Sequence, residues 1–367
     1  MRRITGTVKK KNTLLPWLFS LPIVLSILGL FFVFEASSVN SYTQFGDSFH
    51  YLKLQIIWIA LGIAVMIFLS IFDYHQLYYL SFIFMLGTIV LLFAVLIPGI
   101  GYSAGGARRW IDFGLINLQP TELAKFSVII YLSSWFISKE RKRFFSFIIL
   151  LGILMLLIIL QPDMGTASIV FLLSIIIYFM AGIETFYLFL LVPAAFGIGL
   201  LLIKFSPYRF KRLMAFFNPA LDPQGITYHI NQILISLGNG GLLGRGFGAS
   251  RQKYLFLPEA HTDSIFAIIA EEFGFIGGFL LICLFLFFII QLYRVATSSP
   301  DRFGKLLAVG IFVIFNLQLI INLAGMVNLS PLTGVPLPFI SYGGSNILIS
   351  FALMGILINI AKRAKIT

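Results

Sequence analysis

Charged residues are scarce in this chain of 367 residues. They make up 11% of the sequence, against 59% hydrophobic residues, and the mean hydropathy is +0.99. A soluble domain usually carries about a quarter charged residues. A chain with so few cannot cover an apolar core with polar surface, so its composition indicates a protein embedded in a membrane.

Cysteine occurs once, as Cys283 in an apolar run, which excludes a disulfide within the chain. The histidines His50, His75 and His229 show no metal-ligand spacing, so no structural zinc site is predicted. A divalent cation, Mg²⁺ or Mn²⁺, is compatible with the sequence. No cluster of ligands requires one, and the sequence therefore demands no cofactor.

Long apolar runs rich in aliphatic residues and Phe, which supplies 40 of the 367 residues, are the dominant feature. Runs of ~20 apolar residues can cross a bilayer as helices, and a helix satisfies its own backbone hydrogen bonds there. The runs lack the alternation of barrel strands. We expect an all-α polytopic membrane protein with about ten spans, at 14–34, 52–72, 77–97, 120–138, 145–160, 165–182, 185–205, 264–293, 305–327 and 346–362.

Lysine and arginine set the expected orientation, because short cytoplasmic loops are enriched in both. With the N-terminus inside, the cytoplasmic segments hold 15 of the 26 basic residues, namely Arg2, Arg3, Lys9, Lys10, Lys11, Lys139, Arg141, Lys142, Arg143, Arg294, Arg302, Lys305, Lys362, Arg363 and Lys365. Both termini are then cytoplasmic in the inner (plasma) membrane. Topology accounts for most of the net charge of +12, so no nucleic-acid partner is predicted.

Three external segments gather the polar chemistry on one side of the membrane: 98–119, 206–263 and 328–345. We expect one integral membrane domain over 1–367, in which 206–263 is a large extracytoplasmic loop between helices 7 and 8. This loop is much longer than the connections usual in compact domains. The shared side is the main topological indication of where function lies.

Basic and aromatic residues alternate in YRFKRLMAFFNP, at 208–219 of the large loop. This pattern suits a helix at the membrane interface. Simple phospholipid contact would explain it. The alternative is that Arg209 and Arg212 bind a diphosphate-bearing lipid, because arginine can hold phosphate oxygens bidentately.

A short amphipathic helix is predicted next, from apolar residues at helical spacing between Ile226 and Leu237. Gln232 lies opposite part of its apolar stripe and is a candidate sugar contact. The glycines that follow, from Gly238 to Gly248, suit either a mobile surface loop or a backbone that approaches a ligand closely.

The segment LPEAHTDSIFAIIAEEFG places Asp263 at the outer mouth of a helix, beside the basic loop. Asp263 could cap that helix, or it could act as a general base on a lipid-linked sugar. Glu271 and Glu272 follow about two turns later, some ~12 Å into the span. Two acids at that depth require a cavity or partners, and Glu272 is a candidate substrate contact.

Glu122 and Lys125 are three residues apart and share one helix face. Lys125 could pair with Glu122 as a structural ion pair, or with Glu271 or Glu272 of the other helix. Asp163 opens a further helix at the same outer level, as an N-cap with Thr166 or as a site residue. Glu35 and Asp47 have the pattern of ordinary loop acids.

Five segments together resemble the SEDS (shape, elongation, division and sporulation) family, whose members include FtsW, RodA and SpoVE. They occur in the family's order, cover nearly the whole chain and match the FtsW/SpoVE branch more closely than RodA. Ser264 departs from the Phe expected after the family's Asp. The segments are GARRWIDFGLINLQPTELAKFS, QPDMGTA, YRFKRLMAFFNPALDPQG, the LPEAHTD…EEFG block and NLSPLTGVPLPFISYGGSN.

The resemblance implies a GT-C-like fold of ten transmembrane helices and polymerisation of lipid II into peptidoglycan strands, with undecaprenyl diphosphate as leaving group. It implies that Asp263 is the essential carboxylate and that Trp110 and Lys125 are functional. It also implies a class B penicillin-binding protein as partner, together with undecaprenyl-linked glycan and the membrane.

In this reading Asp263 removes a proton from the acceptor hydroxyl. Cationic side chains, including Arg109, Arg209, Arg212 and Lys125, offset the charge that develops on the diphosphate. Two alternatives remain open. The chain could be a flippase that moves lipid II across the bilayer along its buried acids and Lys125, or a non-catalytic scaffold for the division machinery.

Overall fold

The computed structural model describes residues 13–104, 107–112, 114, 117–138, 143–182, 186–219, 222, 225, 227–254 and 256–364. Over these residues, ten helices of 16 to 34 residues match the ten predicted spans, and α1 and α10 extend beyond them. They are α1 (Leu14–Phe45), α2 (His50–Ile71), α3 (Gln76–Ala94), α4 (Pro120–Trp135), α5 (Phe144–Leu160), α6 (Met164–Met180), α7 (Phe186–Lys204), α10 (Ile265–Ser298), α11 (Arg302–Met326) and α12 (Gly344–Arg363).

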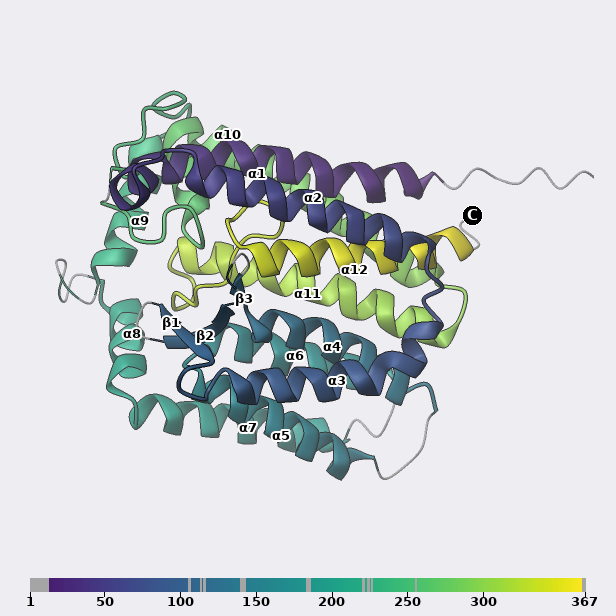
Figure 1. Cartoon of the computed structure of the whole chain (residues 1–367). Helices are drawn as coiled ribbons and strands as arrows, with labels where there is room; N and C mark the ends of the chain where they lie inside the picture. Colours follow the sequence, from purple (N-terminus) through teal and green to yellow (C-terminus); the bar gives the residue numbers. More distant parts are fainter. Residues whose placement is uncertain are drawn as a thin grey trace, which may run out of the picture.

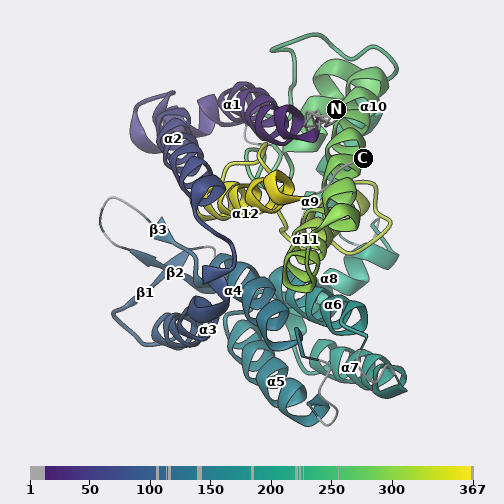
Figure 2. The same cartoon turned by 90° about the vertical axis from the view of Figure 1, so that its right-hand side faces the viewer.

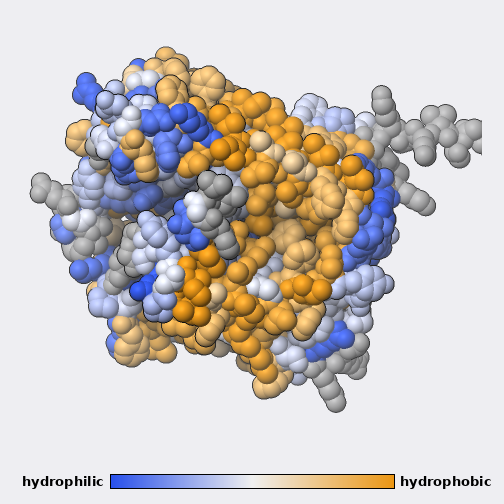
Figure 3. Space-filling view, in the orientation of Figure 1, coloured by the Kyte–Doolittle hydropathy of each residue, from blue (hydrophilic) through white to orange (hydrophobic). Residues whose placement is uncertain are grey.

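The surface has the character of a membrane protein. Seven of the helices are each long and apolar enough to cross a bilayer, and α5 and α6 are apolar helices of 17 residues. In Figure 3 a broad apolar belt lies between two hydrophilic ends. Most side chains of α7 are exposed although the helix is apolar, whereas α4 is buried along almost its whole length. Helix α7 therefore faces lipid, and α4 lies in the interior.

Both described chain ends lie at one end of the helical bundle (Figure 1). The opposite end carries a small sheet of β1 (Gly101–Ala104), β2 (Ala107–Asp112) and β3 (Asn117–Leu118), together with α8 (Pro207–Phe217) and α9 (Tyr228–Gly240). We call this the sheet end. The three polar segments predicted to share one side do lie together here, and the two short helices predicted in the large loop are confirmed.

The sheet itself was not predicted. Its strands pair antiparallel in the order β1-β2-β3, with Tyr102 opposite Trp110. Gln119 follows β3, and its backbone N–H donates to Ser345 Oγ of α12 at 3.0 Å. Ser345 Oγ in turn donates to the Asn117 carbonyl at 3.2 Å. The sheet is thereby fixed to the beginning of α12.

Helix α12 lies inside the bundle, between α2, α4 and α11 (Figure 2). It packs most extensively along α2, and small residues allow the two backbones to approach closely. A Cβ on Gly355 would lie 2.7 Å from the Met66 carbonyl oxygen. A larger residue at this position would force the two helices apart.

Helix α10 was predicted as one continuous span, but it is broken at Gly274, where φ is 66° and ψ is −164°. The glycine-rich segment 241–246 occupies the break. The Arg245 and Gly246 amides donate to the Glu271 and Glu272 carbonyls at 3.1 and 3.0 Å. On the far side of the break, the Phe275 amide donates to the Gly241 carbonyl at 2.8 Å. The close approach that these glycines permit is therefore to the backbone of α10, whose freed polar groups they satisfy.

Candidate active site

Asp263 ends a tight turn at the sheet end, two residues before α10 begins. The turn is closed by the Thr262 and Ser264 amides, which donate to the Glu259 carbonyl at 3.2 and 3.1 Å. The N-cap of α10 is Ser264, and no side chain of the described residues caps the helix. The capping interpretation of Asp263 is therefore wrong. Its carboxylate is buried, with the residue 8% exposed, yet it is not used to hold the helix end.

A loop between α11 and α12 faces the Asp263 carboxylate. Asn322 of α11 donates Nδ2 to the Asp263 carbonyl and to the Val335 carbonyl, each at 2.8 Å. A Cβ on Gly334 would lie 3.7 Å from Asp263 Oδ2, so the bare backbone of this glycine keeps space beside the carboxylate. Sequence reasoning missed Asn322, although an amide within an apolar span is a signal for function.

The surroundings raise the pKa of the Asp263 carboxyl to about 7, first through burial and then through the negative charge of Glu259. The Thr262 hydroxyl and the Arg212 guanidinium act in the opposite direction. A carboxyl with a pKa near neutrality is well matched to accepting a proton from a sugar hydroxyl. The geometry and the acidity of Asp263 both suit a general base.

Arg212 and Arg209, both of α8, have different environments. Arg212 donates Nη1 to the Leu332 carbonyl at 3.2 Å, and its charge acts on Asp263. Arg209 donates to the Leu202 carbonyl of α7 and the Ile159 carbonyl of α5, at 3.5 and 3.3 Å. The charge of Arg212 therefore reaches Asp263, whereas Arg209 lies at the ends of α5 and α7.

Helix α9 contacts the residue that follows Asp263. Its His229 Nε2 lies 2.8 Å from Ser264 Oγ, and burial lowers the pKa of this imidazole to about 4. The Ser at position 264, which departs from the expected Phe, therefore has a polar partner of its own. Gln232 is half-buried on the same helix, one turn further along.

Glu122 and Lys125 of α4 form a buried ion pair. Lys125 Nζ lies 2.6 Å from Glu122 Oε1, and the two side chains are 2% and 5% exposed. Of the two pairings that the sequence left open, the structure has the one within α4. Glu122 Oε2 is buried with no hydrogen-bond partner among the described residues, which leaves an acceptor in the interior for water or substrate.

The two acids of α10 hold the large loop. Ser250 Oγ donates to Glu271 Oε2 at 2.5 Å. Lys253 Nζ lies 2.6 Å from Glu35 Oε2 and 3.5 Å from Glu272 Oε1, with all three side chains largely buried. We call Glu35, Lys253 and Glu272 the ionic triad. The interpretation of Glu35 as a loop acid is wrong, because α1 continues past this residue and the Glu35 carboxylate has a buried partner, Lys253. Asp47 does lie in a loop, where it pairs with the exposed Lys53.

Asp163 caps α6, as one of its two interpretations predicted. Its Oδ1 accepts from the Thr166 amide at 3.1 Å, and its Oδ2 accepts from the Thr166 and Thr121 hydroxyls at 2.9 and 3.3 Å. Arg109 of β2 donates Nε to the Gln161 carbonyl at 3.0 Å, and it also contacts the Pro162 carbonyl. Trp110, its neighbour, is half-buried. Asp163 thus links α6 to α4, and Arg109 links the sheet to the beginning of α6.

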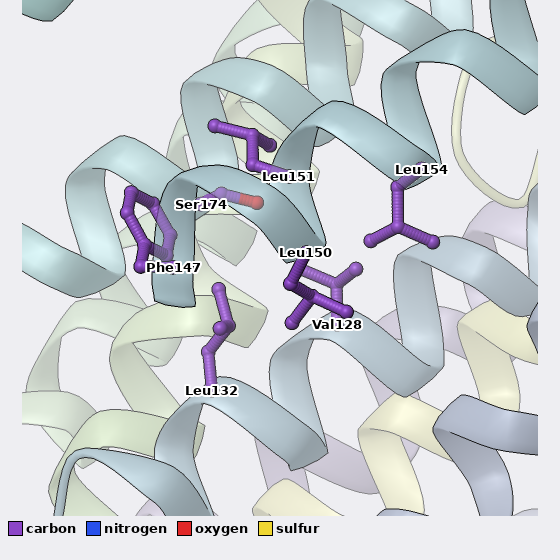
Figure 4. A pocket seen from close by; sticks show the side chains of 7 residues that line it. All are labelled: Val128, Leu132, Phe147, Leu150, Leu151, Leu154 and Ser174. Carbon is purple, nitrogen blue, oxygen red and sulfur yellow. The ribbon is translucent and has the colours of Figure 1, made fainter. Parts of the chain in front are cut away.

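A small gap between α4, α5 and α6 lies inside the helical bundle. It is lined by Val128, Leu132, Phe147, Leu150, Leu151, Leu154 and Ser174 (Figure 4). It offers one hydroxyl and no charge, so it has no groups for sugar chemistry. In Figure 3, by contrast, hydrophilic residues gather at the sheet end. Across the described ranges, no three His, Cys, Asp or Glu residues are grouped as metal ligands.

The model of the FtsW, RodA and SpoVE family of cell cycle proteins matches residues 16–366, nearly the full length. This chain belongs to the FtsW/RodA/SpoVE family. It is 38% identical over 349 residues to a probable peptidoglycan glycosyltransferase FtsW of Geobacter metallireducens, covering 94% of this chain and 93% of that protein. It is also 38% identical over 352 residues to stage V sporulation protein E of Bacillus subtilis, covering 94% and 95%.

Solved structures share the fold of this FtsW/RodA/SpoVE member. A chain of a peptidoglycan synthase complex, described for its coordination of polymerisation and crosslinking, superposes with a TM-score of 0.76 at 24% identity, covering 95% of this chain and 97% of that one. The rod shape determining protein RodA of Thermus thermophilus gives 0.70 at 24% identity, with the same coverage. The arrangement of the apolar helices in this chain is thus that of the solved structures.

Proposed function

We infer that this chain is a peptidoglycan glycosyltransferase that polymerises lipid II into glycan strands and releases undecaprenyl diphosphate. The observation that carries the inference is the state of Asp263. Its carboxylate is buried, is not used as a helix cap, has a pKa of about 7 and lies near the cationic Arg212. The relatives named as glycosyltransferases support the same reaction class.

In the proposed reaction, Asp263 accepts the proton of the C4 hydroxyl of a lipid-linked N-acetylglucosamine. The oxygen then forms a bond to C1 of the donor N-acetylmuramic acid. The bond from C1 to the diphosphate breaks, and the electron pair leaves with undecaprenyl diphosphate. We propose that Arg212 offsets the negative charge that develops on the leaving group.

The remaining candidates support this centre in different ways. We propose that the buried Glu122–Lys125 pair presents a cation and an unsatisfied acceptor to the substrate. Trp110 and Gln232 are half-buried at the sheet end and are proposed sugar or lipid contacts. The contacts already made by Arg109, Arg209, Asp163 and Glu272 favour a supporting role, in which they hold the elements that form the site.

We propose that the sheet end is extracytoplasmic and that both termini are cytoplasmic. At the opposite end, the described basic residues gather where α5, α10, α11 and α12 begin or end, namely Arg143, Arg294, Arg302, Lys305, Lys362 and Arg363. An excess of lysine and arginine is the pattern of cytoplasmic segments. A class B penicillin-binding protein is the proposed partner, since a structural neighbour belongs to a complex that coordinates polymerisation with crosslinking. The proposed reaction does not require a metal ion; if Mg²⁺ or Mn²⁺ takes part, the diphosphate oxygens would be its ligands, since the described residues hold no group of three His, Cys, Asp or Glu.

The test uses the full chain, co-expressed with a class B penicillin-binding protein of its host and supplied with lipid II. Wild-type protein is expected to make polymer, and Asp263→Asn to lose at least about a hundredfold in rate, the scale of a positioned general base. Polymer formed equally well by both proteins would contradict the assignment of the base. Movement of lipid II across the bilayer without polymer would favour the flippase instead.

A further inference from the structure

Two carboxylates share one hydroxyl in the turn that carries Asp263. Thr262 Oγ1 lies 2.9 Å from Glu259 Oε2 and 3.3 Å from Asp263 Oδ1, so the two carboxylate oxygens are no more than about 6 Å apart. A threonine hydroxyl has a single hydrogen and can donate to one acceptor at a time. Glu259 and Asp263 therefore compete for the same donor while repelling each other.

The backbone of Glu259 is strained. Its φ of 50° lies in the left-handed region, which residues other than glycine adopt uncommonly. The turn nevertheless holds it there, because the Thr262 and Ser264 amides both donate to the Glu259 carbonyl. Glycine or asparagine would occupy this position with less strain. A strained, acidic residue beside a reactive side chain is the pattern of a position that serves function rather than stability.

We propose that Glu259 is a positioning residue for Asp263: a second negative charge, held in place by the turn, that makes the base a stronger proton acceptor. The proposal rests on the proposed function of Asp263. Glu259 is exposed and has no role as an acceptor from the sugar in the reaction given above. Its effect passes through Asp263, because close like charges favour the protonated form of a carboxyl.

The other groups around the turn do not supply this charge. Arg212, from α8, acts on Asp263 in the opposite direction. Burial lowers the pKa of His229, from α9, and of His261, within the turn. An imidazole ring is either neutral or positive, so neither histidine supplies negative charge. Tyr51 of α2 and Tyr342 before α12 pack against His261, with ring centres 4.5 and 5.6 Å away, and burial raises the pKa of Tyr342 to about 12. Of the neighbours named here, Glu259 is the one that places a negative charge beside Asp263.

The decisive measurement is the pH dependence of lipid II polymerisation by the full chain, between pH 5 and 9. In Glu259→Gln, the midpoint of the acid limb is expected to fall by about half a unit or more, because Asp263 loses a repelling neighbour. The rate on the plateau at high pH is expected to fall by about two- to threefold, since Asp263 becomes a weaker base. An unshifted midpoint would overturn the proposal.

Thr262→Val provides a test in the opposite direction. It removes the hydroxyl that donates to the ionised form of Asp263, so the midpoint is expected to rise. A structural role for the turn alone would not move the two midpoints apart. Midpoints that moved in the same direction in Glu259→Gln and Thr262→Val would contradict the proposal.

Two further variants separate charge from folding. Glu259→Asp keeps the charge, so the midpoint of its acid limb is expected to stay close to the wild-type value. Glu259→Asn is neutral and suits the left-handed backbone, so it is expected to reproduce the shift of Glu259→Gln in a folded protein. Asp263→Asn separates the proposed role of Asp263 from the proposed role of Glu259. If Asp263→Asn still polymerises, the proposed base is wrong; if it is inactive while Glu259→Gln has an unchanged pH profile, only the role of Glu259 is wrong.

Discussion

Asn322 of α11 holds the Asp263 carbonyl and the Val335 carbonyl with the two hydrogens of one amide, each at 2.8 Å. The residue is 2% exposed, so neither bond competes with bulk water. Asp263 lies two residues before α10 begins, and Val335 belongs to the loop that faces the Asp263 carboxylate. A single side chain thus fixes the distance between the proposed base and the opposite wall of the site.

We therefore predict that Asn322→Ala impairs the reaction more than the fold. The change leaves two carbonyls without their donor, at a cost of about 1–3 kcal/mol in the free energy of unfolding. Displacement of Asp263 by a fraction of an ångström is expected to reduce the rate about 10–100-fold. Lipid II polymerisation and thermal unfolding, measured on the same preparation, separate the two effects.

Asn316→Ala is the matched control, because Asn316 is on the same helix and, among the described residues, donates only to the Phe312 carbonyl one turn earlier. It removes an amide without touching the site and is expected to retain most of the activity. Equal losses in the two variants would show that α11 needs its amides for folding alone.

The pH dependence of the wild-type enzyme follows from Asp263. Because its pKa is raised to about 7, the carboxyl is mostly protonated below that pH and cannot accept a proton. We predict that the rate falls about tenfold for each pH unit below about 6.5 and levels off above about 7.5. The pKa of His229 is lowered to about 4, so this histidine cannot produce a limb in that range. A rate that stayed constant down to pH 5 would contradict the assignment.

The sequence predicted what depends on local pattern. Apolar runs gave the ten long helices, helical spacing gave α8 and α9, and the acid at the mouth of a span drew attention to Asp263. It could not predict the break in α10, because Gly274 is compatible with a helix until segment 241–246 supplies replacement hydrogen bonds. The ionic triad was missed for the same reason: Glu35 and Lys253 are 218 residues apart, and their pairing is a product of the fold.

Gly274→Ala is predicted to disrupt the sheet end. A Cβ there would lie 2.3 Å from the Gly244 nitrogen and 2.6 Å from the Leu242 oxygen, both backbone atoms, and the positive φ disfavours any L side chain. We expect loss of the folded protein, or a sharply lower unfolding temperature in detergent. Gly278→Ala in the same helix is the control, since its nearest neighbour is the end of the Phe266 ring at 3.4 Å. It should be tolerated, and comparable damage in the two variants would argue against the inserted segment as the cause.

The ionic triad gives a prediction about stability. Lys253→Met leaves Glu35 and Glu272 in the interior without their shared cation, and Glu272 is almost fully buried. Removal of one partner from such a group is expected to cost about 3–5 kcal/mol in the free energy of unfolding. Lys53→Met, which breaks the exposed pair with Asp47, should have no measurable effect.

The triple variant Glu35→Gln/Lys253→Met/Glu272→Gln decides whether the cost comes from unpaired charge. With all three charges removed, no ion is left to be desolvated, so most of the lost stability should return. Activity is expected to recover less, because Lys253 also donates to the Gly248 carbonyl at 2.8 Å and so fixes the loop that leads to Asp263. Thermal unfolding and polymerisation of lipid II, compared across the single and triple variants, measure the two contributions separately. If the triple variant were no more stable than Lys253→Met, the packing of the lysine side chain, and not its charge, would be what holds the loop to α1 and α10.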